Sequence, residues 1–127
     1  MIPNAIEVVT LFVDDIDAAK AFYQSVFAPE IVYEDGVSAV LAFKGAMINL
    51  LAASEAPPLV TPAPVGASGT GSRMLLTIRV DSVDDTAAAL AAKGVALLNG
   101  PIDRPWGRRT AAFADPSGHA WEIAEEI

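Results

Sequence analysis

Hydrophobic and polar positions follow nearly the same order twice along this chain. Residues 9–17 read VTLFVDDID, and residues 76–84, placed 67 positions later, read LTIRVDSVD. Each copy is an apolar run that ends in a short acidic segment and is followed by an alanine-rich stretch. A repeat of this length indicates two copies of one supersecondary unit, because a solenoid needs three or more short repeats. We therefore expect two half-modules that face each other across a cleft.

The first copy predicts a strand, a helix and three further strands. Residues 7–13 are rich in β-branched and apolar residues and are too short for a stable helix. Residues 18–27 place apolar side chains at helical spacing, with Asp14 or Asp15 as the expected N-cap and Pro29 as the stop. The three strands are expected at residues 30–34, 37–44 and 46–52.

Residues 54–72 interrupt the pattern. This segment contains four prolines and three glycines, which do not favour the interior of regular elements. A loop of this length is uncommon inside a compact domain. Two interpretations stay open: a tether between the repeats, or a loop that folds over a ligand cleft or reaches a second subunit.

The second copy repeats the order of the first. A strand is expected at residues 73–81 and a helix at residues 83–93, with Gly94 as its left-handed cap. Further strands are expected at residues 95–98, 108–114 and 120–125. The predicted fold class is α+β, with βαβββ repeats at residues 1–53 and 73–127 of a single domain that covers residues 1–127, and with curved sheets around a cleft.

Composition narrows the possible partners. Hydrophobic residues make up 53% of the chain against 19% charged residues, so a packed core is expected. Sixteen acidic against eight basic residues give a net charge of −8, which argues against binding to nucleic acids or anionic membranes. No apolar stretch approaches the ~20 residues that cross a bilayer. The absence of cysteine excludes disulfides and thiolate metal sites, and fits a cytoplasmic protein.

Two blocks of sequence resemble the vicinal oxygen chelate superfamily, which contains glyoxalase I, extradiol dioxygenases, fosfomycin-resistance transferases and bleomycin-resistance proteins. The first block is LFVDD at residues 11–15 with Phe22-Tyr23, and the second is FADPSGHAWEI at residues 113–123. Together with the internal repeat, the resemblance covers essentially the whole chain. It implies two modules whose curved sheets close around the active cleft. It also implies a divalent metal that is held by four side chains, one from each of four strands.

The four metal positions of the family carry over to Val8, Asn49, Leu75 and Glu122. A divalent cation in a working site usually needs three or more protein ligands with lone pairs, and valine and leucine offer none. The only histidine, His119, lies three residues before Glu122 on an expected strand, so these side chains point to opposite faces. We therefore expect no metal site and no cofactor.

Other catalytic arrangements are also missing from the sequence. There is one histidine and no cysteine, and no G-x-S-x-G elbow occurs. The glycine-rich stretch at residues 66–71 lacks the lysine of a phosphate-binding loop. We expect no catalytic residues, although Glu122 as a general base stays open.

The expected ligand-binding residues follow from strand alternation and from the resemblance. The concave faces are expected to present Val8, Phe12, Met47, Asn49, Leu51, Leu75, Thr77 and Glu122. Trp106, in a Pro-Trp-Gly segment before a strand, is either a stacking platform for a flat ligand or an interface or core aromatic. Tyr33 and Phe113 are further aromatic candidates.

The resemblance is strongest to the bleomycin-resistance branch, whose members are acidic homodimers without a catalytic metal. It predicts a homodimeric protein that sequesters a bulky, partly aromatic antibiotic-like natural product, as in drug binding or self-resistance. The alternative is a glyoxalase-like lyase or isomerase, or a dioxygenase-related enzyme, with Glu122 as base or with a weak metal site. A biosynthetic helper that chaperones a reactive intermediate is a third possibility.

Overall fold

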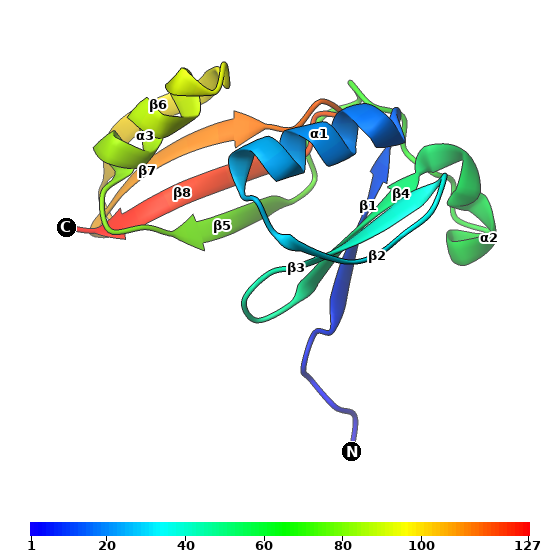
Figure 1. Cartoon of the computed structure of the whole chain (residues 1–127). Coiled ribbons are helices and arrows are strands. Elements are labelled where there is room, and N and C mark those ends of the chain that lie inside the picture. Colours follow the sequence, from blue (N-terminus) through cyan, green and yellow to red (C-terminus); the bar gives the residue numbers. More distant parts are fainter. The chain divides into compact units, whose positions relative to one another are not determined.

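The computed structural model describes all of residues 1–127 and divides the chain into two compact units, Met1–Thr70 and Gly71–Ile127. Each unit contains one four-stranded sheet and one long helix (Figure 1). The boundary between the units falls within the expected connecting segment, residues 54–72. The α+β fold class and the repeated βαβββ order are therefore confirmed.

Unit 1 follows the predicted order closely. Its elements are β1 (Val8–Val13), α1 (Ile16–Val26), β2 (Glu30–Glu34), β3 (Ser38–Ala42), β4 (Met47–Ala52), a 3-10 turn η1 (Ala53–Glu55) and the short helix α2 (Pro57–Val60). The strands lie in the order β1-β4-β3-β2, with β1 parallel to β4 and the other neighbours antiparallel.

Unit 2 repeats this topology. Its elements are β5 (Leu75–Arg79), α3 (Val83–Ala92), β6 (Leu97–Arg104), β7 (Arg108–Ala114) and β8 (Ala120–Glu126). The strands lie in the order β5-β8-β7-β6, again with one parallel pair, β5 and β8. No helix in either unit is long and apolar enough to cross a membrane.

Both long helices begin at side chains that bind the free backbone N–H groups of their first turn. The Asp15 carboxylate accepts hydrogen bonds from the backbone N–H groups of Asp17 and Ala18, each at 3.0 Å. For α3 the cap is the Ser82 hydroxyl, which accepts a hydrogen bond from the Asp85 N–H at 3.1 Å. Such caps typically stabilise a helix by about 1 kcal/mol.

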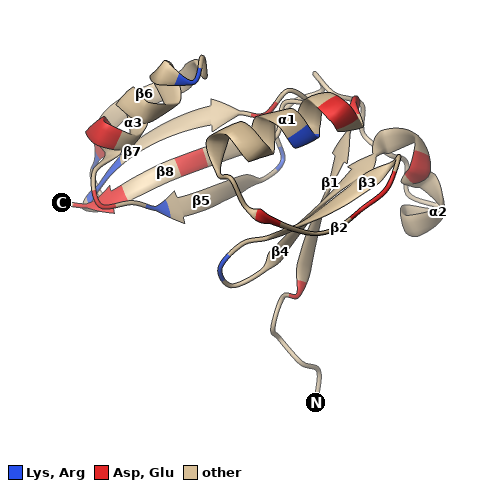
Figure 2. Cartoon of the chain, viewed as in Figure 1, with Lys and Arg blue, Asp and Glu red and all other residues tan.

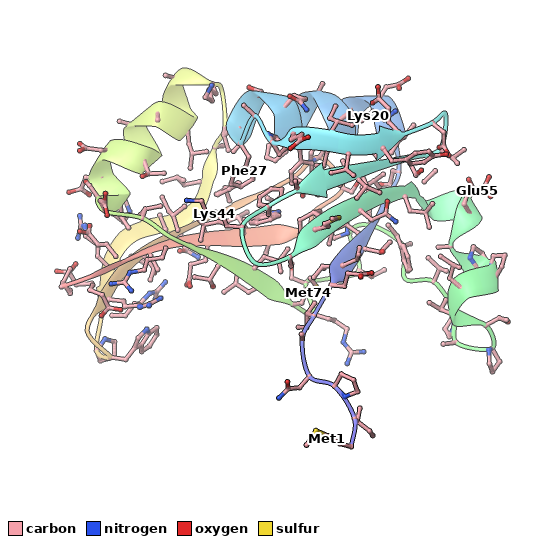
Figure 3. The ribbon with its side chains drawn as sticks, turned by 60° about the horizontal axis from the view of Figure 1, so that its bottom comes forward. Met1, Lys20, Phe27, Lys44, Glu55 and Met74 are labelled. Carbon is pink, nitrogen blue, oxygen red and sulfur yellow. The ribbon has the colours of Figure 1, made fainter.

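The core of each unit lies between its helix and one face of its sheet. In unit 1, Leu11 and Val13 are buried on the same side as Tyr23 of α1, and Tyr23 stacks on Phe27, labelled in Figure 3. In unit 2, Trp121 and Ile123 are buried in the same way. Because side chains alternate along a strand, these four residues lie on the face opposite to the residues expected on the concave faces. The opposite face of each sheet is not covered by its own helix.

Two predicted boundaries were wrong because proline and glycine were taken as breaks. The segment from residue 54 begins with η1 and α2, since proline is tolerated in the first turn of a helix. Strand β6 was expected to end at Leu98, but it continues to Arg104. The Gly100-Pro101 step lies within a β-bulge, where the pairing shifts by one residue and the strand continues.

Candidate functional site

We call the face of each sheet that its own helix does not cover the open face. In unit 1 this face carries a row of four side chains, one from each strand. The pairing register places Thr10 beside Asn49, Asn49 beside Val40, and Val40 beside Tyr33. The Asn49 amide donates a hydrogen bond from Nδ2 to the Thr10 hydroxyl oxygen at 3.4 Å. The Asn49 Oδ1 atom is buried and has no hydrogen-bond partner. Asn49 therefore keeps an unused acceptor in the middle of the row.

Apolar side chains flank this row on both sides. Val8 pairs with Met47, and Phe12 pairs with Leu51, so all four lie on the same face as Asn49. Val8 and Met47 are partly exposed, whereas Leu51 is nearly buried. The residues expected on the concave face of the first repeat therefore do share one face.

A β-bulge places Tyr33 in this row. Ile31 pairs with Leu41, and Tyr33, two residues on, pairs with Val40, so β2 contains one extra residue. Tyr33 is 55% exposed, and its hydroxyl donates a hydrogen bond to Asp35 Oδ2 at 2.9 Å. This hydrogen bond to the Asp35 carboxylate raises the pKa of Tyr33. The ring is therefore anchored at its polar end while much of its surface stays accessible.

The sheet in unit 2 carries the corresponding row. The register places Thr77 beside Glu122, Glu122 beside Ala112, and Ala112 beside Asn99. The Thr77 hydroxyl donates a hydrogen bond to Glu122 Oε1 at 3.0 Å. The other carboxylate oxygen has no partner. The partly exposed Leu75 lies two residues before Thr77 and shares its face.

The turn between β6 and β7 adds an aromatic and a cationic group to unit 2. Trp106 is 67% exposed at this turn. The guanidinium carbon of Arg104 lies 6.0 Å from the centroid of the Trp106 ring. Sequence reasoning selected Trp106 but missed Arg104. Arg104 could have been found by pairing residues outward from the turn, which places it opposite Arg108 and two residues before Trp106.

The structure does not bring Phe113 to the open face. Phe113 pairs with Trp121 and is fully buried on the helix-covered side of the sheet. Its neighbour Ala112 pairs with Glu122 and occupies the open face instead. Because side chains alternate along a strand, Phe113 belongs to the core of unit 2.

The donor set does not fit the divalent metal that the family's enzymes hold. Val8 and Leu75 have no donor atom, and the side chains of Asn49 and Glu122 are hydrogen-bonded to threonines. No group of three or more His, Cys, Asp or Glu side chains comes together as a metal site needs.

The only histidine is tied into the turn before β8. His119 Nδ1 lies 2.8 Å from Oδ2 of Asp115, whose side chain is fully buried. The other oxygen of Asp115 accepts hydrogen bonds from the backbone N–H groups of Ser117 and His119, each at 2.9 Å. His119 therefore supports the turn that leads into β8.

Comparisons with known proteins agree on one family. A family model described as the glyoxalase/bleomycin resistance protein/dioxygenase superfamily matches residues 5–123. A comparison with curated proteins finds no match. A glyoxalase/bleomycin resistance protein/dioxygenase from Nocardioides is similar in fold, with a TM-score of 0.86 and 22% identity, covering 100% of this chain and 85% of the other.

Two solved structures with higher identity carry different functional names. Lactoylglutathione lyase from Agrobacterium tumefaciens is 26% identical, with a TM-score of 0.76, and the match covers 97% of this chain and 94% of the lyase. TnmS3, an antibiotic binding protein from Streptomyces sp. CB03234, is 27% identical, with a TM-score of 0.74 over 100% of this chain and 99% of TnmS3. Because the family model spans nearly the whole sequence, the chain belongs to the glyoxalase/bleomycin resistance protein/dioxygenase superfamily.

Proposed function

We propose that this protein binds a bulky, partly aromatic antibiotic-like natural product and releases it unchanged. The observation that carries the proposal is the make-up of the two open faces. They combine apolar and aromatic side chains with a few hydrogen-bonding groups, and two of the family's four metal positions, Val8 and Leu75, lack ligand atoms. Apolar contact stabilises a complex by roughly 25 cal/mol per Å² of buried surface, so such faces need no reaction to hold a large flat molecule.

The proposed ligand contacts lie on the open face of each unit, taken by itself. The residues are Val8, Phe12, Tyr33, Met47, Asn49 and Leu51 in unit 1, and Leu75, Thr77, Trp106 and Glu122 in unit 2. Within this set, the free oxygen of Glu122 accepts a hydrogen bond from a hydroxyl or amine group of the ligand. The exposed Trp106 ring stacks on an aromatic part of the ligand.

The likeness to TnmS3 supports this proposal, because its name describes an antibiotic binding protein and the match covers nearly all of both chains. We further propose that the protein acts as a homodimer in the cytoplasm, as expected from the resemblance and from the lack of cysteine. Light scattering coupled to size-exclusion chromatography tests the dimer, for which we expect twice the 13.2 kDa chain mass.

A thermal-shift screen of natural products tests the binding function. A ligand present at 100 times its Kd stabilises the folded protein by about 2.7 kcal/mol, which raises the melting temperature measurably. Each hit is then titrated by calorimetry, and the recovered ligand is examined by mass spectrometry. We expect the ligand to be recovered unaltered, and its chemical conversion in catalytic amounts would contradict the proposal.

Replacement of Trp106 by alanine identifies the stacking contact. We expect Trp106→Ala to weaken binding about tenfold, because an aromatic contact and its buried area together are worth more than 1 kcal/mol. Leu59→Ala is the matched control, since Leu59 is also 67% exposed but lies on the helix α2, outside the strands that form the two open faces. An equal effect of the two substitutions would exclude Trp106 from the binding site.

A lyase or isomerase function is the second candidate. Two observations favour it: the likeness to lactoylglutathione lyase, and the free carboxylate oxygen of Glu122 on the open face of unit 2. Elemental analysis of protein purified without a chelator separates the two candidates. Stoichiometric nickel, zinc, manganese or iron would favour the enzyme, as would turnover that is lost on Glu122→Gln.

A further inference from the structure

Unit 2 holds a guanidinium group without a counter-ion on its open face. The β6–β7 hairpin carries three arginines, and two are ion-paired: Arg108 with Glu126 at 2.9 Å, and Arg109 with Asp84 and Asp103 at 3.0 and 2.8 Å. Arg104 has no carboxylate partner. It is nevertheless half-buried, so its charge is not simply left in solvent.

Neutral groups fix the position of the Arg104 side chain. Its Nε donates a hydrogen bond to the hydroxyl of the buried Thr110 at 3.0 Å, and an NH2 hydrogen points to Asn99 Oδ1 at 3.4 Å. Trp106 lies beside its planar group. A guanidinium held by uncharged acceptors keeps its full charge and further N–H groups for a ligand, and its orientation is set before binding.

The second of two bulges in β6, between Asn99 and Ile102, places Arg104 on the same face as Asn99. Asn99 pairs with Ala112 and Ile102 pairs with Thr110, so three steps along β6 match two along β7. With regular alternation from Asn99, Asp103 would lie on the open face and Arg104 on the helix side. The extra residue reverses this: Asp103 pairs with Arg109, and Arg104 lies on the face of Glu122 and Asn99.

We propose that Arg104 and Trp106 form an anion-selective end of the ligand site, which binds an aromatic ligand through a carboxylate, phenolate or enolate oxygen. This inference rests on the proposed function and names its ligand class. The guanidinium donates charge-assisted hydrogen bonds to the oxygen, while Trp106 stacks on the attached ring. The preference for anions belongs to this site and not to the whole protein, since acidic side chains outnumber basic ones over the chain (Figure 2).

Glu122 gives the site its opposite end. Glu122 and Asn99 are two strands apart in the same row, which corresponds to roughly 10 Å at the usual strand spacing. The carboxylate of Glu122 repels a second anionic group and accepts a hydrogen bond from a hydroxyl or amine. The fitting ligand is therefore a fused aromatic system of about three rings, with an acidic edge and a donor at the far end.

Three anthracenes that share one ring system test the inference. The probes are 9-anthracenecarboxylate, 9-anthracenemethanol and 9-(aminomethyl)anthracene, titrated by fluorescence at low ionic strength. We expect the carboxylate to bind about tenfold more tightly than the neutral alcohol, and the ammonium compound to bind most weakly. Arg104→Gln should weaken carboxylate binding about tenfold and change alcohol binding less than about twofold.

Arg108→Gln is the matched control, because Arg108 lies directly opposite Arg104 in the register but is already paired with Glu126. We expect this substitution to change the affinity for each probe less than about twofold. If Arg104→Gln fails to fold, as judged by circular dichroism, Arg104→Lys carries the test. Lysine keeps the charge but loses the planar fork, so a preference for the carboxylate should persist in weakened form.

The outcomes separate this inference from the proposed function. Equal binding of all three anthracenes, or an unchanged preference in Arg104→Gln, overturns the anion-selective site and leaves ring binding intact. Failure of all three to bind up to their solubility limit also overturns it, while a hit in the natural-product screen would still support the proposed function. A carboxylate preference that disappears with Arg104→Gln and persists with Arg108→Gln supports the inference.

Discussion

Asp35 organises the turn between β2 and β3 and, through it, the Tyr33 ring. Its carboxylate accepts hydrogen bonds from the Val37 N–H at 2.9 Å, the Tyr33 hydroxyl at 2.9 Å and the Ser38 hydroxyl at 3.0 Å. These bonds, chiefly that from Val37 and then that from Tyr33, lower the pKa of Asp35. On the other side of the turn, the Lys20 ammonium group, labelled in Figure 3, donates a hydrogen bond to the Asp35 carbonyl oxygen at 2.9 Å.

A pH titration tests this arrangement. Because the pKa of Asp35 is lowered in the folded state, its contribution to stability is present above the unfolded carboxyl pKa and is lost as the pH falls through the folded value. We expect Asp35→Asn to remove this part of the acid dependence in urea unfolding. In the same variant, the pKa of Tyr33 should fall toward the ordinary tyrosine value, as measured by NMR of the ring carbons. An unchanged Tyr33 pKa would show that the hydroxyl bond is absent in solution.

Single residues also show how far the sequence predicts the site. Alternation along β1, β4, β5 and β8 correctly groups Val8 with Phe12 and Thr77 with Leu75, because these strands carry no bulge. Tyr33 and Arg104 lie on strands that do contain bulges, so alternation counted across a bulge does not determine their faces. Phe113 was expected at the ligand site but lies in the core. In the sequence, no other residue of its strand had been assigned to a face, so alternation had no starting point.

The second bulge in β6, between Asn99 and Ile102, depends on a glycine. Gly100 has φ +86°, and a Cβ atom there would lie 2.5 Å from the Thr110 carbonyl oxygen and 2.7 Å from the Ala111 Cα. Both contacts are with backbone, which cannot move aside without breaking the pairing of β6 with β7. Arg104 therefore lies on the same face as Asn99 because Gly100, four residues earlier, has no side chain.

Replacement of Gly100 by alanine should be strongly destabilising. We expect a loss of about 3 kcal/mol, the sum of a positive-φ penalty and a steric clash. Gly45→Ala is the control, because Gly45 has φ +90° but nothing within 4 Å of the added carbon, so only about 1 kcal/mol should be lost. The difference is measured by chemical unfolding of both variants, and equal losses would refute a close backbone approach at Gly100.

At the level of elements, the sequence predicts most of what the structure contains. Strands β2 and β7 have their predicted bounds, because turn-forming residues flank each of them. The helix α2 was missed, since proline at its first positions looks like a break in a pattern but fits the first turn of a helix. The length of β6 was missed for a related reason: a bulge absorbs Gly100-Pro101 without ending the strand.

Across the whole molecule, each unit has its own sheet, helix and core, and the chain between them is weakly held. Residues 61–74 lie outside helices and strands, and nearly all are exposed. Few hydrogen bonds support this segment, among them one from the Thr70 hydroxyl to the Ala67 carbonyl oxygen at 2.6 Å. Such segments open locally far more easily than strands do.

Limited trypsin digestion should therefore cut first after Arg73. The expected early products are residues 1–73 and 74–127, identified by mass spectrometry. Arg73→Gln should remove the early cut and prolong the lifetime of the intact chain. Early cleavage after Lys44, in the turn between β3 and β4, would instead locate the least stable backbone inside unit 1.

The parallel pairs β1–β4 and β5–β8 have a consequence for the order of folding during synthesis. In each unit the first strand pairs with the last, so the sheet closes only after the whole unit has left the ribosome. Unit 1 has all its strands once Ala52 has emerged, while the strands of unit 2 have yet to leave the ribosome. The N-terminal half therefore has time to bury its own apolar residues before β5 appears, which keeps two sets of similar strands from pairing with the wrong partners.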